Sequence, residues 1–149
     1  METTTIHTAF AKAQSEFPKL SKDATNPFFK NKYVSLDNIL EVVIPILHSN
    51  GLYLTQSPVS NHEEGIGVHT SIVHAETGEM IQGSFMLPLA KQDPQGAGSA
   101  ITYARRYALQ SILGLNFEDD DDANHASNKV TKNKLSNMSS EEQIDLLGY

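Results

Sequence analysis

Cysteine and tryptophan are both absent from the 149 residues of this chain. Without cysteine it can form no disulfide, no thiolate nucleophile and no cysteine-ligated zinc or iron–sulfur site. No apolar run approaches the roughly 20 residues that span a bilayer, and the first residues, METTTIHTAF, lack the basic and apolar regions of a signal peptide. We therefore expect a cytoplasmic protein that contacts no membrane.

Motifs for ATP and zinc chemistry are missing as well. The chain has no GxxxxGK[ST] phosphate loop, so we expect no dependence on ATP. It has no HExxH motif, and His69 and His74 lie at opposite parity on a predicted strand, so they point to opposite faces. The acidic run 118–122 could bind a divalent cation weakly, or it could simply be solvated. We expect no resident cofactor, no metal site and no catalytic residue, hence no enzyme.

Positive charge is scarce and unevenly placed. The net charge is −7, of which residues 118–149 contribute −5 through eight acids and three bases. No lysine or arginine lies between Tyr33 and Ala90, so the bases of the remaining chain fall into 12–32 and 91–106. Such clusters can create a local positive groove that attracts a phosphate backbone, although scattered surface lysines are the alternative.

Hydrophobic periodicity predicts an α+β fold. Apolar residues at helical spacing indicate a first helix. Ser35 can cap a second helix, which Pro45 is expected to kink and which ends at Asn50 and Gly51. Three alternating segments joined by short links indicate an antiparallel β-meander packed with helices. A polar, proline-containing stretch, 20–35, is expected to be an ordered loop. The predicted helices and strands are 3–17, 36–48, 52–59, 65–75, 79–89 and 99–113.

Residues 118–149 differ from the rest in composition. They combine a five-acid run with few apolar residues, which is typical of a flexible linker. Ser139 or Ser140 could cap a short terminal helix. The predicted organisation is one domain at 1–117 followed by an acidic, flexible tail at 118–149.

The segment 26–33, NPFFKNKY, interleaves three aromatic side chains with two lysines. Exposed rings can stack on unpaired bases while lysines neutralise phosphates, which suits single-stranded nucleic acid of any sequence. Alternatively, Phe28 and Phe29 are core anchors. Because neighbouring side chains of an extended segment point in opposite directions, we expect one of the two to be buried.

The segment 91–107 overlaps a glycine-rich turn, 90–100, that we expect to open the last helix. Backbone N–H groups at such a start can hold a phosphate. Helical geometry places Arg106 on the polar face, as a phosphate contact, and Arg105 at its edge, where it could bind an internal carboxylate or a neighbouring subunit. A solvated face is the alternative. The predicted apolar stripe is Ala100, Ile101, Ala104, Ala108 and Ile112, and the opposite face is Ser99, Thr102, Tyr103, Arg106 and Gln110.

The stretches 26–52 and 87–124 resemble the paired signatures of the Erf (essential recombination function) family of single-strand annealing proteins from bacteriophages and prophages, with similarity over about 6–124. The resemblance implies ATP-independent annealing in homologous recombination and DNA repair, within rings or filaments. It also implies a β-β-β-α core like that of Rad-type annealing proteins, and the host cell's cytoplasm as location. The matched signature residues are Asn26, Pro27, Phe28, Lys30, Lys32, Tyr33, Lys91, Pro94, Gln95, Gly98, Ser99, Ile101, Tyr103, Arg105, Arg106 and Tyr107.

Together these observations predict a protein that binds and anneals single-stranded DNA. Expected partners are other copies of the chain and, through 118–149, a phage exonuclease or the host single-strand-binding protein. A single-strand-binding protein that only protects DNA is the second hypothesis, and a metal-dependent nuclease using 118–122 the third. The predicted DNA-binding residues are Phe28, Lys30, Lys32, Tyr33, Lys91, Gln95, Ser99, Tyr103, Arg105 and Arg106.

Overall fold

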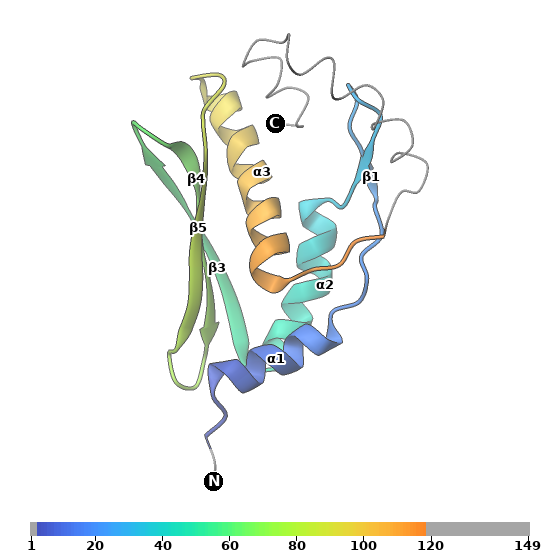
Figure 1. Cartoon of the computed structure of the whole chain (residues 1–149), viewed down its shortest axis with the longest axis vertical. Coiled ribbons are helices and arrows are strands. Elements are labelled where there is room, and N and C mark those ends of the chain that lie inside the picture. Colours follow the sequence, from blue (N-terminus) through green and yellow to red (C-terminus); the bar gives the residue numbers. More distant parts are fainter. Residues whose placement is uncertain (1–2, 119–149) are drawn as a thin grey trace, which may run out of the picture.

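The computed structural model describes residues 3–118, which fold as three helices and two antiparallel sheets (Figure 1). The α+β class is therefore confirmed. The predicted tail and its terminal helix lie outside the described residues, apart from Glu118. The elements are α1 (Ile6–Glu16), β1 (Ala24–Thr25), β2 (Lys32–Tyr33), α2 (Leu36–Ser49), β3 (Leu52–Asn61), β4 (Gly65–His74), β5 (Met80–Leu87) and α3 (Pro94–Leu113).

The larger sheet is the predicted meander, in the order β3-β4-β5, and α3 follows it to complete the β-β-β-α order. The link between β4 and β5 is tight because Gly78 adopts a φ of 75° and its N–H donates to the carbonyl of His74 at 2.8 Å. Pro58 lies within β3, where it is tolerated because β3 is an edge strand.

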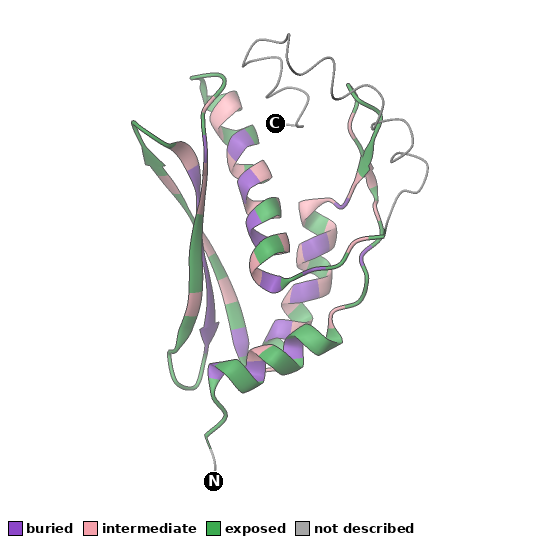
Figure 2. Cartoon of the chain, viewed as in Figure 1, coloured by how far each residue is buried: buried purple, intermediate pink, exposed green. Residues whose placement is uncertain are grey.

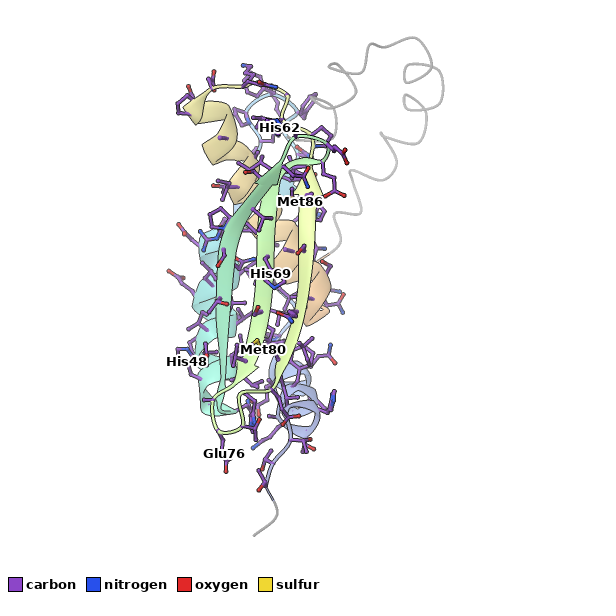
Figure 3. The ribbon with its side chains drawn as sticks, turned by 90° about the vertical axis from the view of Figure 1, so that its left-hand side faces the viewer. His48, His62, His69, Glu76, Met80 and Met86 are labelled. Carbon is purple, nitrogen blue, oxygen red and sulfur yellow. The ribbon has the colours of Figure 1, made fainter. Side chains whose placement is uncertain are left out.

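All three helices lie on one side of this sheet (Figure 1). No element of residues 3–118 covers the opposite face, which we call the open sheet face, and Figure 3 shows His69, Met80 and Met86 on it. On the covered side, α3 runs along β4 and β5, while α2 packs against β3 and α3. The buried residues therefore line the space between the sheet and the helices (Figure 2).

Helix α3 contributes to both buried clusters of the molecule. Its alanines at four-residue spacing, Ala100, Ala104 and Ala108, pack with Val68 and Leu87 of the sheet. Further along, Leu109 and Leu113 are fully buried in the larger cluster, among residues of α1, α2, β3 and β4. The alanines match the predicted stripe, but Ile101 and Ile112 are only partly buried. Leu109 and Leu113, which the predicted stripe did not include, lie on a different side of the helix from the alanines and pack in the larger cluster.

Helix α2 begins as predicted, with Ser35 as its N-cap, and Pro45 lies inside it. Helix α3 begins at Pro94, five residues before the predicted start at Ser99. Asp93 is the N-cap and proline occupies the first turn, and these two strong helix-start signals outweigh the cost of Gly96 and Gly98 in the helix. The predicted glycine-rich turn is therefore largely helical.

A second difference concerns the stretch expected to be a loop. It contains a short antiparallel hairpin, in which Ala24 pairs with Tyr33 and Thr25 pairs with Lys32. We call β1, β2 and the residues between them the β1–β2 hairpin. Strands of two residues are too short to produce a recognisable alternating pattern, so the sequence showed only the turn residues.

Replacing Leu109 by alanine tests the packing of α3. Because the side chain is fully buried, Leu109→Ala should lower the free energy of unfolding by about 2 to 5 kcal/mol in urea denaturation. Met80→Ala is the control, because Met80 is 56% exposed on the open sheet face, and it should cost less than about 1 kcal/mol. If both variants lost the same free energy of unfolding, the packing of Leu109 would not stabilise the helix against the core.

Candidate nucleic-acid interface

The tip of the β1–β2 hairpin is a compact turn organised by Asn26. Its side-chain oxygen accepts hydrogen bonds from the backbone N–H groups of Phe28, at 2.9 Å, and Phe29, at 3.3 Å. Its backbone carbonyl accepts from the N–H of Lys30 at 2.8 Å, and Lys30 takes a φ of +54°. This local pattern is a turn that asparagine commonly stabilises. The phenylalanines are therefore not in an extended segment.

Both phenylalanines are exposed, Phe28 by 86% and Phe29 by 42%. The expectation that one of the two would be buried is wrong, because it assumed an extended strand with an inner and an outer face, whereas the turn directs both rings away from the core. Neither ring is a core anchor. Almost the whole ring of Phe28 is therefore accessible to another molecule.

At its other end, the hairpin is fastened to α2 through Asp23. This carboxylate accepts hydrogen bonds from the backbone N–H of Ser35, at 2.8 Å, and from its hydroxyl, at 2.7 Å. The Ser35 hydroxyl in turn accepts from the N–H of Asn38 and so caps the helix. The two hydrogen bonds from Ser35 lower the pKa of Asp23 below its ordinary value of 3.8, and the bond from the Ser35 N–H has the larger effect.

A cluster of aromatic rings around Arg106 joins the hairpin to α3. The guanidinium carbon lies 4.3 Å from the ring centroid of Tyr33, 5.6 Å from that of Tyr103 and 5.2 Å from that of Tyr107. Tyr103 and Tyr107 also contact each other, with centroids 4.4 Å apart. The predicted polar face of α3 is therefore partly covered by β2. A stacked guanidinium keeps its N–H groups in its own plane, so stacking by itself leaves them able to bind a phosphate.

Arg105 turns toward the sheet instead. Its Nε–H donates to the side-chain oxygen of Gln56 in β3 at 3.3 Å. The amide nitrogen of Gln56 donates back to the carbonyl of Arg105 at 3.2 Å and to the hydroxyl of Thr70 at 3.0 Å. The internal partner of Arg105 is thus an amide, whereas the sequence suggested an internal carboxylate or a neighbouring subunit. The amide supplies the acceptor that a partly buried arginine needs without burying a second charge.

A groove of about 760 Å³ lies between the hairpin tip and the first turns of α3. Four of the predicted residues line it, namely Phe28, Lys91, Gln95 and Ser99. Segments more than sixty positions apart in the sequence therefore form its two sides. Its walls also include Leu87, the last residue of β5, and the next two residues, Pro88 and Leu89. Leu87 also belongs to the smaller buried cluster, so only the tertiary structure reveals that it and the two residues after it line a groove.

The start of α3, where the glycine-rich segment predicted a phosphate contact, carries an acidic side chain. The carboxylate of Asp93 accepts the N–H of Gly96 at 2.6 Å, so a negative charge already caps this helix end. A phosphate there would be repelled by that carboxylate.

Exposed lysines offer positive charge nearby. Lys30 and Lys32 extend from the hairpin and Lys91 lies beside the groove. Residues 3–118 form no salt bridge to any of the three, so their ammonium groups are available to phosphates.

A family model for the ERF superfamily matches residues 6–146 of this chain. The chain belongs to the ERF superfamily. The resemblance to the Erf family is thereby confirmed, and the match extends beyond Asn124, where the recognised similarity ended. Membership places the chain among proteins of phage recombination and single-strand annealing. No curated protein and no solved structure matches the chain significantly.

Residues 3–118 contain neither a membrane-spanning helix nor a cluster of metal-ligating side chains. No helix in that range has the length and apolarity to cross a membrane. No group of three or more histidine or acidic side chains there is arranged to hold a metal ion. The acidic run considered for cation binding lies, beyond Glu118, outside the described residues.

Tyr33→Leu tests whether the ring stack fastens the hairpin to α3. Losing a cation–π contact of about 0.5 to 1 kcal/mol should let the hairpin open about two to five times more often. Hydrogen exchange at the amide of Asn26, which donates to the carbonyl of Asn31 across the hairpin, measures this opening. The control is Tyr53→Leu, since Tyr53 is an exposed tyrosine of β3. Unchanged exchange in Tyr33→Leu would contradict the proposed fastening.

The Asp23–Ser35 contact predicts a pH dependence. Because the folded-state pKa of Asp23 is lowered, its ionised form favours folding, so the stabilisation is full above the ordinary pKa and is lost as the pH falls through the folded pKa. The free energy of unfolding of the wild type should therefore exceed that of Asp23→Asn at pH 7, with the difference shrinking below about pH 4. A difference that stays constant from pH 7 to pH 3 would show that ionisation of this carboxyl contributes nothing.

Proposed function

We propose that this protein binds single-stranded DNA without sequence preference and accelerates the pairing of complementary strands without ATP. The supporting observation is that segments 26–33 and 91–107 meet at one surface. That surface combines an almost fully exposed ring, Phe28, with three lysines that form no salt bridge within residues 3–118. Family membership supports the same function.

The mechanism requires neutralised phosphates and an extended strand but no catalytic group. Lys30, Lys32 and Lys91 would neutralise phosphates, which lowers the repulsion between two complementary strands. Arg106 would add a fourth cation, already oriented by its tyrosines. Rings at the hairpin tip would stack on unpaired bases of any identity. Base pairing itself supplies the driving free energy. Copies of the chain assembled as a ring or filament would repeat this surface along the strand, holding it extended.

The annealing rate of two complementary oligonucleotides, one carrying a fluorophore and the other a quencher, tests this function. The purified protein should accelerate quenching relative to a protein-free control, in the absence of ATP. Slower pairing with demonstrable binding would favour a protective single-strand-binding protein. Shortening of the strands only when Mg²⁺ is added would favour a nuclease. Absence of any binding would contradict the proposal.

The salt dependence of binding identifies the phosphate contacts. For single strands, the slope of log K against log salt concentration falls by about 0.7 for each contact removed. Lys30→Gln and Arg106→Gln should each reduce the slope by about that amount, equally for all DNA sequences. Lys12→Gln is the matched control, because Lys12 is exposed on α1, and α1 lies at the opposite end of the molecule from the start of α3 (Figure 1). An unchanged slope would remove the tested residue from the interface.

A further inference from the structure

The groove is lined largely by apolar residues and carries opposite charges that balance. Its lining includes Leu87, Pro88 and Leu89, and its charged groups are the carboxylate of Asp93 and the ammonium of Lys91. The Asp93 carboxylate is held in place by the N–H of Gly96. A phosphate inside the groove would meet this carboxylate and would lose water to apolar surface. The interior therefore suits an uncharged, flat, partly apolar group, whereas phosphates suit the exposed lysines.

Two polar side chains in the groove can bind such a group without selecting one chemical pattern. Gln95 carries both a donor and an acceptor in its amide, and the Ser99 hydroxyl can also donate or accept. Every nucleobase has donors or acceptors along its edge, so each could find a partner here. Phe28, on the opposite side, has most of its ring free. A volume of about 760 Å³ falls within the usual range for small-molecule sites.

We propose that the groove holds one unpaired nucleobase of the bound strand. The base lies against the Phe28 ring, with its edge toward Gln95 and Ser99, while Lys30 and Lys91 bind the flanking phosphates. This inference rests on the proposed function, since it assumes that the strand is bound at this surface, and it specifies which part of the strand enters the groove.

One consequence is discrimination between single strands and duplexes. Bases in a duplex are paired and stacked, so none can enter the groove without the cost of unpairing. A base held in the groove must leave it to pair with a complementary strand. Formation of the duplex therefore removes the contact that held the single strand, which favours release of the annealed product.

A comparison of normal and abasic DNA tests the proposal. Fluorescence anisotropy would measure the affinity of the full chain for oligothymidylate and for an equally long oligonucleotide of abasic residues, at one salt concentration. Both carry the same phosphate charge. The wild type should bind oligothymidylate about tenfold more tightly, the size expected for one base stacked on an aromatic ring.

Two variants locate the base. Ser99→Leu fills the groove from an exposed helical position, and Phe28→Ala removes the exposed ring. Each should reduce the preference to less than about twofold by weakening binding to oligothymidylate alone. Ser111→Leu makes the same change as Ser99→Leu at an exposed position near the other end of α3, and it should keep the full preference. Circular dichroism would confirm that the variants fold, and Phe28→Ala alters no core contact.

The outcomes separate this inference from the proposed function. Equal binding of both oligonucleotides by the wild type would overturn the base-binding groove but leave single-strand binding intact. A preference that survives in both Ser99→Leu and Phe28→Ala would place the base elsewhere and also overturn it. Failure to bind either oligonucleotide would overturn both proposals.

Discussion

The close packing of α3 on the sheet is the constraint on which the rest of the structure depends. Ala100, Ala104 and Ala108 present no atoms beyond Cβ, so they allow the helix backbone to lie near β4 and β5. The same helix carries its leucines into the larger buried cluster. Once α3 is placed, its first turns form one wall of the groove and Arg106 faces the hairpin. Core, groove and ring stack are thus consequences of one packing arrangement.

The hairpin is the second part of the interface, and it has little core of its own. Its position depends on two contacts near its base, the carboxylate of Asp23 with Ser35 and the ring of Tyr33 with Arg106. In both contacts a charged group binds a neutral partner, so neither contact neutralises the charge of a lysine. Within residues 3–118, this arrangement explains how an acidic protein can present positive charge without ion pairs at one surface, since the nearby acids Asp23 and Asp93 accept hydrogen bonds from backbone amides instead of neutralising lysines.

Elements with strong local signals were predictable from the sequence. The period-two segments became β3, β4 and β5, and Ser35 capped α2. Gly114 ended α3 in the left-handed conformation, with a φ of 64°, as a glycine after a helix commonly does. Prediction failed where local signals competed or were too short. Gly96 and Gly98 suggested a turn, but Asp93 and Pro94 started a helix, and the two-residue strands of the hairpin left no periodicity to detect.

By itself, the sequence determined the fold class, the β-β-β-α order and membership in the ERF superfamily, because these follow from local periodicity and from residues matched in order. It also named Phe28 and Arg106, but not their surroundings. Only the tertiary structure exposed both phenylalanines, turned Arg105 to Gln56 and placed Tyr33 on Arg106. Contacts between residues so distant along the chain depend on how the helices pack on the sheet, and no local pattern records that packing.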